Sequence, residues 1–169
     1  MIYIYSCYAG THSSSIAAAL HLKRIREDRI PTKSEILNIE YFNKLKKKDM
    51  GRIIYRGMDE DGNKVYTLGR GTSNILLPCI KDLVTILQSE SGLNEKIVLS
   101  NMSPCVTVSM SVGGFLSRRL GLDFIGVPFL IIGCQLGFRN IVRVVNHTKE
   151  AAKNSSDNVL VLMNDLRRM

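Results

Sequence analysis

The sequence predicts an α/β fold: a single-domain three-layer sandwich over residues 1–169, whose mostly parallel sheet carries an added β-hairpin. Short apolar segments rich in β-branched residues alternate with segments that repeat apolar residues at helical spacing. Two adjacent β-type segments flank an Asp-Gly pair, which is a turn signal for a hairpin. The length of 169 residues fits one domain, and 45% apolar with 22% charged residues excludes a disordered or collagen-like chain.

The chain opens with a predicted strand, a Gly/Ser-containing loop and a helix. Residues 2–7 (IYIYSC) are β-branched and aromatic, which is typical of a strand. Residues 8–12 form the loop, and residues 13–25 hold three consecutive alanines among apolar positions that suit packing on a sheet. Ligands of parallel α/β sheets bind beyond the carboxyl ends of the strands. The loop after Cys7 is therefore the first place to look for a site.

The middle of the chain predicts a capped helix and the hairpin. Thr32, with Glu35 three residues later, has the spacing of a capping box at the start of a short helix. Residues 52–56 (RIIYR) and 64–68 (KVYTL) are the two predicted hairpin strands, and residues 61–62 (DG) supply the turn.

The second half predicts further helices and buried strands. A helix is predicted over residues 74–89 and ends at Gly92, because glycine readily adopts the left-handed conformation that follows a helix. The other predicted elements are a strand over 96–99, a helix over 105–120 capped by Gly121, a buried strand over 129–132 (FLII) and a helix over 135–153. Residues 159–163 fit either a strand or a helix. Loops toward helices are thus expected after residues 7, 99 and 132.

The charge of the chain favours an anionic partner. Lys and Arg number 23 against 15 Asp and Glu, which gives +8, so nucleotides, phosphoesters, nucleic acid and membrane surfaces are all candidates. Solubility is the simpler explanation of the same charge. The densest cationic run is typical of a solvated face and consists of Lys44, Lys46, Lys47 and Lys48. The absence of Trp disfavours a stacking platform for single-stranded nucleic acid.

The cysteines and the apolar segments indicate a cytoplasmic protein with reduced thiols. Cys7, Cys79, Cys105 and Cys134 are widely spaced, without a CxxC pair, so a metal site is not expected. No secretory signal precedes the first strand. The longest apolar stretch, near residues 127–132, is far shorter than the ~20 residues that cross a bilayer, and no membrane partner is expected.

Residues 6–15 (SCYAGTHSSS) are the segment most typical of a ligand site. Backbone N–H groups at a helix N-terminus are unpaired and attract anions, and Gly10 would allow close approach of the backbone. Thr11, Ser13 and Ser14 offer hydroxyl donors, and His12 can carry a proton near neutral pH. The segment therefore predicts a phosphate or carboxylate site, although Thr11 or Ser13 could also simply cap the helix.

The segment partly matches the nucleotide-binding phosphate loop GxxxxGK[ST]. His12 stands at the Lys position and Ser13 at the Ser/Thr position, but Ser6 and Thr11 replace the two glycines. In this interpretation magnesium would accompany a bound nucleotide. The cofactor itself is left open by the sequence.

A second template resembles the low-molecular-weight tyrosine phosphatases, in which Cys ends a strand and Arg-Ser follows after five residues. Cys7 and Ser14 fit, but Ser13 occupies the Arg position. A guanidinium clamp would have to come from elsewhere, and the candidates are Arg70, Arg118, Arg119 and Arg139. A third template resembles the phosphocysteine loop of sugar phosphotransferase IIB proteins, matched here by Cys7, Ala9 and Gly10.

Cys7 is the candidate nucleophile in both cysteine templates, because a helix N-terminus favours a thiolate. A buried strand-end cysteine that packs as a small apolar residue is the alternative.

Cys105 stands at a second strand-to-helix junction, and packing is the expected role for it. His21 and His147 are predicted on helices, in packing or solvated positions. The hairpin-tip acids Asp59, Glu60 and Asp61 are explained by turn chemistry, and Gly113-Gly114 would let a helix approach a neighbour closely.

Five motifs in a fixed order resemble a bacterial family known as domain of unknown function 3189. They are GTHSS at residues 10–14, Gly-Arg at 51–52 and 69–70, Pro-Cys-Val at 104–106 and GGFLSRRLG at 113–121. The resemblance runs from Ile2 to about Val145 and implies that the anion-site residues are family features, without implying a reaction. It also implies a His before the first Gly-Arg pair, where this chain has Met50.

Three hypotheses follow. The first is a phosphate- or nucleotide-binding protein that acts as a phosphotransferase or phosphohydrolase. Cys7 or His12 would take part in the chemical step, Gly10, Thr11, Ser13 and Ser14 would bind phosphate, and Arg70, Arg118 and Arg119 would neutralise its charge. The second is a non-catalytic regulatory module that binds an anion or a protein, and the third is an RNA- or DNA-binding protein that uses the lysine run. The oligomeric state is left open.

Overall fold

The computed structural model describes residues 1–92 and 94–167 and confirms the α/β fold with a mixed, mostly parallel sheet of five strands. The strands are β1 (Ile2–Cys7), β2 (Ile53–Met58), β3 (Lys64–Gly69), β4 (Ile97–Asn101) and β5 (Val159–Leu162). The helices are α1 (Ser13–His21), α2 (Lys33–Asn38), α3 (Leu76–Ser91), α4 (Val108–Arg118) and α5 (Asp123–Asn154), with 3-10 turns η1 (Lys47–Asp49) and η2 (Ser103–Cys105).

The sheet order is β2-β3-β1-β4-β5. β1 pairs in parallel with β3 and β4, β4 pairs in parallel with β5, and β2 pairs antiparallel with β3. The predicted hairpin is therefore confirmed, and it forms one edge of the sheet. The register sets Cys7 opposite Gly69 and Ser6 opposite Asn101, so the carboxyl ends of β1, β3 and β4 meet at one edge.

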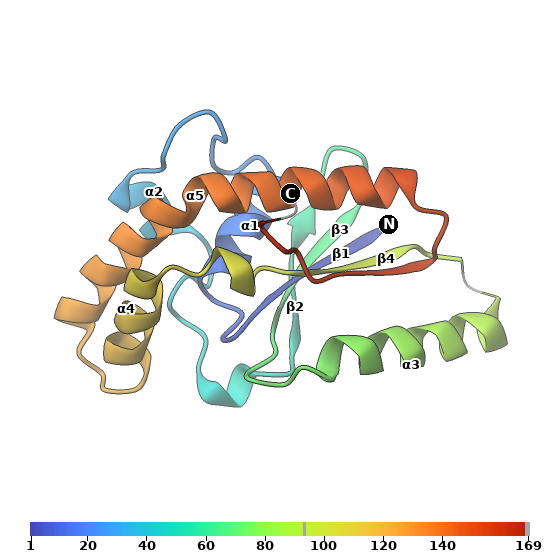
Figure 1. Ribbon diagram of the computed structural model, residues 1–169, viewed down its shortest axis with the longest axis horizontal. Coiled ribbons are helices and arrows are strands. Elements are labelled where there is room, and N and C mark those ends of the chain that lie inside the picture. Colours follow the sequence, from blue (N-terminus) through green and yellow to red (C-terminus); the bar gives the residue numbers. More distant parts are fainter. Residues whose placement is uncertain (93, 168–169) are drawn as a thin grey trace.

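Helices cover both faces of the sheet (Figure 1). α1 and α5 bury one core against alternate residues of the strands, among them Tyr3, Val65 and Val98. α3 covers the other face, where Leu77 packs with Ile4 and Leu68 of the opposite pleat. α4 packs on α5 instead of the sheet, and the two form a hairpin at one end of the molecule.

Several local signals led to the right structure. Thr32 Oγ1 accepts a hydrogen bond from the backbone N–H of Glu35, and the Glu35 carboxylate accepts one from the N–H of Thr32, which completes the predicted capping box. Gly92 follows α3 with a φ of 68°, as predicted. Residues 159–163, whose sequence fits either a strand or a helix, contain the strand β5, which is parallel to β4.

The predicted strand over residues 129–132 is wrong, because these residues lie inside the 32-residue helix α5. Leu130 and Ile131 are buried, whereas Phe129 and Ile132 are exposed, which is helical rather than strand periodicity. The flanking Pro128 and Gly133 resembled turn signals. The expected loop after residue 132 therefore does not exist.

Two other predicted helices have different bounds. The first was predicted to run to residue 25 and ends at His21, shortly before Lys23 adopts a φ of 54°. The second, predicted over residues 105–120, consists of η2 and α4, because Val106 and Thr107 are extended. Thr107 caps α4 through its hydroxyl.

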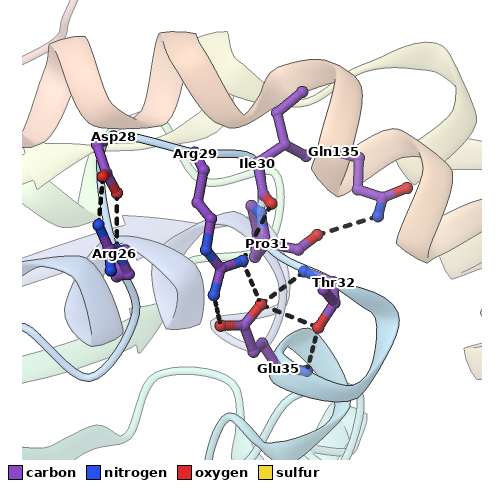
Figure 2. Close-up of polar contacts among 8 residues, drawn as sticks. All are labelled: Arg26, Asp28, Arg29, Ile30, Pro31, Thr32, Glu35 and Gln135. Atoms are coloured by element: carbon purple, nitrogen blue, oxygen red, sulfur yellow. Dashed lines mark hydrogen bonds and ion pairs between the residues drawn. The ribbon is translucent and has the colours of Figure 1, made fainter.

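The segment between α1 and α2 lies alongside α5 and is held there by polar contacts (Figure 2). The Gln135 side-chain amide on α5 donates to the carbonyl of Pro31 at 3.0 Å. Arg29 forms a forked ion pair with Glu35, and this contact together with the capping hydrogen bonds lowers the pKa of Glu35 to about 2. The ion pair is exposed, so its role is to hold the segment in place rather than to add much stability.

Candidate functional site

The loop after β1 lies where three parallel strands end. The N–H of Arg70, after β3, donates to the carbonyl of Cys7 at 3.0 Å, and the N–H of Gly71 donates to that of Tyr8 at 2.9 Å. The N–H of Met102, after β4, donates to the carbonyl of Ser6 at 2.7 Å. These bonds bring the loops after β1, β3 and β4 together, as expected for a site in an α/β sheet.

Cys7 is held by the start of α1. The backbone N–H of Gly10 donates to Cys7 Sγ at 3.2 Å, and the Ser14 hydroxyl lies 3.1 Å from the same sulfur. The side chain is buried, with 3% of its surface exposed. The sulfur thus has one backbone N–H donor and one hydroxyl beside it at the start of α1.

Gly10 allows two backbones to approach each other. Its φ is 71°, and a Cβ at this position would lie 2.6 Å from the backbone nitrogen of Gly69. Gly10 was predicted to allow an anion to approach the backbone, whereas the close approach in the structure is to the backbone of β3. It places the Gly10 N–H against Cys7, which makes Gly10 part of the cysteine cradle.

Ser13 carries a buried hydroxyl without a partner. Ser13, the first residue of α1, is fully buried, and its Oγ has no hydrogen bond in the described part of the chain. The two following hydroxyls are engaged, since Ser14 contacts Cys7 and Ser15 donates to the carbonyl of Gly10 at 3.5 Å. An unpaired buried hydroxyl costs about 1–3 kcal/mol, and such groups recur at functional sites.

Thr11 fastens the loop to residues 41–45. Its hydroxyl donates to the carbonyl of Tyr41 and accepts the N–H of Lys44 at 3.2 Å, while its carbonyl accepts the N–H of Asn43 at 3.3 Å. The hydroxyl predicted to bind phosphate is thus used inside the protein.

Replacing Thr11 with valine, which has nearly the same shape, is expected to lower the free energy of unfolding by about 2 kcal/mol. The change removes the hydroxyl that bonds the Tyr41 carbonyl and the N–H groups of Lys44 and Leu45, and it leaves only the bond from the Lys44 N–H to the Tyr41 carbonyl. Urea denaturation followed by circular dichroism measures the change. The Thr11→Ser variant keeps the hydroxyl and should recover most of it, and equal losses in both variants would show that the methyl group matters instead.

His12 has a fixed tautomer. Nε2 donates to Asn43 Oδ1 at 3.1 Å, Asn43 Nδ2 donates to the Ser117 hydroxyl at 2.8 Å, and Ser117 donates to Asp123. Burial lowers the pKa of His12 to about 4, against the opposing effect of the Asn43 hydrogen bond, and the Arg118 charge lowers it further. The imidazole is therefore neutral at pH 7, with Nδ1 as a hydrogen-bond acceptor.

The predicted arginines lie in different environments. Arg70 bridges the loops after β3 and β4, since Nη1 donates to the carbonyl of Ser73 at 2.8 Å and Nη2 to the Ser103 hydroxyl at 3.2 Å. Its Nε is buried without a partner. Arg118 donates to the carbonyls of residues 43 and 45, and Arg119 lies over the Phe115 ring. Arg70 is thus the candidate arginine whose backbone contacts the Cys7 loop.

Asn43, Ser117 and Ser103 are site residues that the sequence analysis missed. Asn43 lies 31 residues from His12 along the chain, and the neighbouring residues in the sequence form no motif that predicts the contact. One signal was present, because Asn tolerates the left-handed conformation and Asn43 has a φ of 52°. Met50, the residue at the position where the resemblance implied a His, lies beside Gly71, next to the same loops.

The other residues considered in the sequence analysis are packed in the core or hydrogen-bonded within the protein. Cys105 is packed in the core, and burial raises its pKa to about 12. His21 is buried between Tyr5 and Asp59. Asp59 accepts the N–H groups of Asp61 and Asn63, as turn chemistry predicted. Within residues 1–92 and 94–167, no group of three or more His, Cys, Asp or Glu side chains could hold a metal ion.

Comparison with known proteins gives one match. No curated protein and no solved structure matches the chain. A family model matches residues 2–150, a span that contains all five motifs quoted above. The match confirms the resemblance and covers most of the chain, and the chain therefore belongs to the family described as Protein of unknown function (DUF3189).

Proposed function

We propose that the loop after β1 and the N-terminus of α1 bind the phosphate group of a small molecule, and that Cys7 is the nucleophile of a phosphotransferase or phosphohydrolase. The observation that carries the proposal is the cradle around the thiol. Cys7 Sγ lies within hydrogen-bond distance of the Gly10 N–H and the Ser14 hydroxyl, and Ser13, the neighbour of Ser14 in the chain, has a buried hydroxyl without a partner. The expected cap by Thr11 or Ser13 does not account for these hydroxyls, because His12 is the N-cap of α1 and no side chain makes a capping hydrogen bond there.

The protein groups that would bind the phosphate can be proposed from the buried donors that have no hydrogen-bond partner within the protein. Ser13 Oγ and Arg70 Nε are buried polar atoms without a partner, and both are donors that an anion would satisfy. The first N–H groups of α1 supply the favourable end of the helix dipole. His12, which burial keeps neutral and whose Nε2 donates to Asn43, would accept a hydrogen bond at Nδ1 from a protonated oxygen of the ligand or from an attacking hydroxyl. Arg118 and Arg119 have no part in this assignment.

Binding requires a local opening. Cys7 is 3% exposed and Ser13 is fully buried, so a phosphate group reaches them only if the neighbouring segment moves. Tyr8 and Ala9, which follow Cys7, are exposed and half-buried respectively.

Cys79 on α3 is exposed and serves as an internal reference for a labelling experiment. We expect iodoacetamide to modify Cys79 quickly and Cys7 slowly, and phosphate or vanadate to slow only Cys7, as mapped by mass spectrometry.

The direct test is a thermal-shift panel of phosphate, vanadate, nucleotides and sugar phosphates, with and without magnesium. A ligand at about 100 times its dissociation constant adds roughly 2.7 kcal/mol, which raises Tm by about 5–11 °C. The Ser13→Ala variant separates function from stability. It removes an unsatisfied buried group, so it should be as stable as the wild type or about 1 kcal/mol more stable, and it should lose most of the shift.

The chemical role of Cys7 is tested with the Cys7→Ser variant and a chromogenic phosphate ester. Turnover by the wild type that disappears in Cys7→Ser, with the phosphate-induced Tm shift kept, supports catalysis. Tight binding without turnover in the wild type would make the protein a non-catalytic anion-binding module. A panel without any shift, or a shift that Ser13→Ala and His12→Ala leave unchanged, would contradict the anion site itself.

A further inference from the structure

The hairpin of α4 and α5 concentrates exposed apolar side chains. Ten large apolar residues of this segment are exposed, with Val108 at 81% and Phe124 at 76% of their surfaces. The full set is Val108, Val112, Phe115, Leu120, Leu122, Phe124, Ile125, Phe129, Ile132 and Leu136. These exposures add up to on the order of 1,000 Å2 over the whole hairpin, whereas one contiguous apolar patch on a typical monomer reaches roughly 300–600 Å2.

The exposed side chains point in more than one direction. α4 contacts α5 through Gly113 and Ser117, which lie on the opposite side of the helix from Val112 and Phe115. The exposed side chains of α5 recur at spacings of three and four residues, on the side away from the buried Phe138. A flat protein surface that covered one of these stripes would leave the other in water. A medium that surrounds the end of the hairpin covers both.

Few charges interrupt this surface. Between residues 107 and 135 the chain has three charged side chains, Arg118, Arg119 and Asp123. The carboxylate of Asp123 accepts the hydroxyl of Ser117. Arg139 and Arg143 are exposed on the next turns of α5. The rim of the apolar surface is therefore cationic.

The lysine run lies against the same hairpin. Arg118, at the end of α4, donates to the backbone carbonyls of Asn43 and Leu45. Asn43 and Leu45 flank Lys44, and Leu45 immediately precedes the other three lysines of the run. All four lysines (Lys44, Lys46, Lys47 and Lys48) are exposed. The fold thus places an exposed polybasic segment beside an exposed apolar hairpin, although the residues in contact are 75 and 73 positions apart in the chain.

We propose that the α4–α5 hairpin and the lysine run dock the protein on an anionic lipid surface, with the hairpin inserted at the level of the headgroups. Apolar insertion combined with a polybasic patch is the usual way to hold a protein on such a surface. The expectation of no membrane partner came from the length of apolar stretches, which concerns spanning. Docking at the interface needs no such length.

The protein lies on the bilayer and does not cross it. α5 is long and apolar enough to span, but 44% of its most apolar 18-residue window is buried inside the protein. Its buried side packs on the core that faces the sheet, so the helix cannot leave the fold without exposing that core. A second copy of the chain is disfavoured as the occupant, because it would bring two cationic rims together in a protein of net charge +8.

Flotation of the full chain with lipid vesicles tests the proposal. We expect the protein to float with vesicles that contain phosphatidylglycerol, and to stay behind with phosphatidylcholine alone or at about 1 M salt, where charges are screened beyond roughly 3 Å. Phe124→Glu should abolish flotation, since it places a carboxylate in the apolar surface. It should fold normally, because Phe124 is exposed and lies in the first turn of α5, where the helix dipole favours an acid. Replacing Lys47 with Gln should weaken binding about fivefold.

Leu83→Glu on α3 is the matched control, because Leu83 is also exposed but lies outside the hairpin. It should float like the wild type. Three results would overturn the proposal: no flotation with anionic vesicles, equal losses for the Phe124 and Leu83 variants, or a dimer in light scattering that Phe124→Glu disperses. The last result would identify a second copy as the occupant of this surface.

Discussion

Replacing Gly113 with alanine is expected to lower the free energy of unfolding by about 2–4 kcal/mol, because the added methyl group has no space. A Cβ on Gly113 would lie 2.6 Å from the backbone nitrogen of Leu130 and 2.7 Å from the carbonyl oxygen of Gly126. Both atoms belong to the backbone of α5 and cannot rotate away. The two helices would have to separate.

The adjacent glycine is the matched control. A Cβ on Gly114 would meet no atom closer than His12 Cε1, at 3.4 Å. Alanine is favoured over glycine inside a helix by up to about 1 kcal/mol, so Gly114→Ala should be neutral or slightly stabilising. At about 2–4 °C per kcal/mol, Tm should fall by roughly 10 °C for Gly113→Ala and stay within about 4 °C of the wild type for Gly114→Ala.

Calorimetry of the two variants gives their unfolding temperatures, which test how closely α4 and α5 are packed. If Gly113→Ala unfolded at the wild-type temperature, α4 and α5 could not be packed as closely as the structure has them. The same contact recurs along the hairpin, since a Cβ on Gly133 would lie 2.4 Å from the nitrogen of Met110. The close approach suggested by the Gly113-Gly114 pair is thus real, but only the first of these glycines makes it.

The sequence predicted those elements whose signals are local. β1, the hairpin and the capping box depend on residue type, a turn or a three-residue spacing, and each of these is visible within a few residues. Residues 129–132 are different. A run of four apolar residues between Pro128 and Gly133 fits a buried strand as well as a helix. The choice depends on α4, whose backbone requires glycine at positions 126 and 133 of α5.

The site was predictable to the same extent. The strand, loop and helix that cradle Cys7 are contiguous in the chain, so their arrangement followed from the sequence of residues 6–15. The hydrogen bond from His12 to Asn43 crosses 31 positions, and the one from Arg118 to the carbonyl of Asn43 crosses 75. Such contacts depend on how the elements pack, and the residue types alone could not distinguish Arg70 from Arg118 as a ligand group.

The protein is expected to lose stability as the pH falls from 6.5 toward 4, because the imidazoles of His12 and His21 are neutral in the fold. Burial lowers the pKa of His21 to about 4, against the opposing effect of its hydrogen bond to Asp59, and burial lowers that of His12 to about 4 as well. In the unfolded chain both groups titrate near 6.5. Between these values the unfolded state binds more protons, so stability rises with pH up to 6.5 and is then level.

About half of the effect should come from His21, which is held by buried hydrogen bonds at the C-terminal end of α1. His21 Nε2 donates to Asp59 Oδ2 at 2.9 Å, and His21 Nδ1 accepts the Tyr5 hydroxyl at 2.7 Å. Partial burial alone would raise the pKa of Asp59, but hydrogen bonds from Asn63 and His21 lower it to about 2. Protonating His21 would cost it the acceptor role toward Tyr5, whose side chain is fully buried. A shift of this size corresponds to roughly 3 kcal/mol for each imidazole.

Urea midpoints measured between pH 7.5 and pH 4.5 test this expectation, and the part of the range above about pH 5.5 lies above the usual titration of carboxylates. The wild-type midpoint should fall steadily below pH 6.5. His21→Gln should be less stable at pH 7.5 but have about half the pH dependence, because one of the two imidazoles is gone. His147→Gln, which changes an exposed side chain of α5, should keep the wild-type profile. A midpoint that stays constant from pH 7 to 5 would mean that the unfolded and folded states bind protons equally there, and that neither histidine is held neutral by the fold.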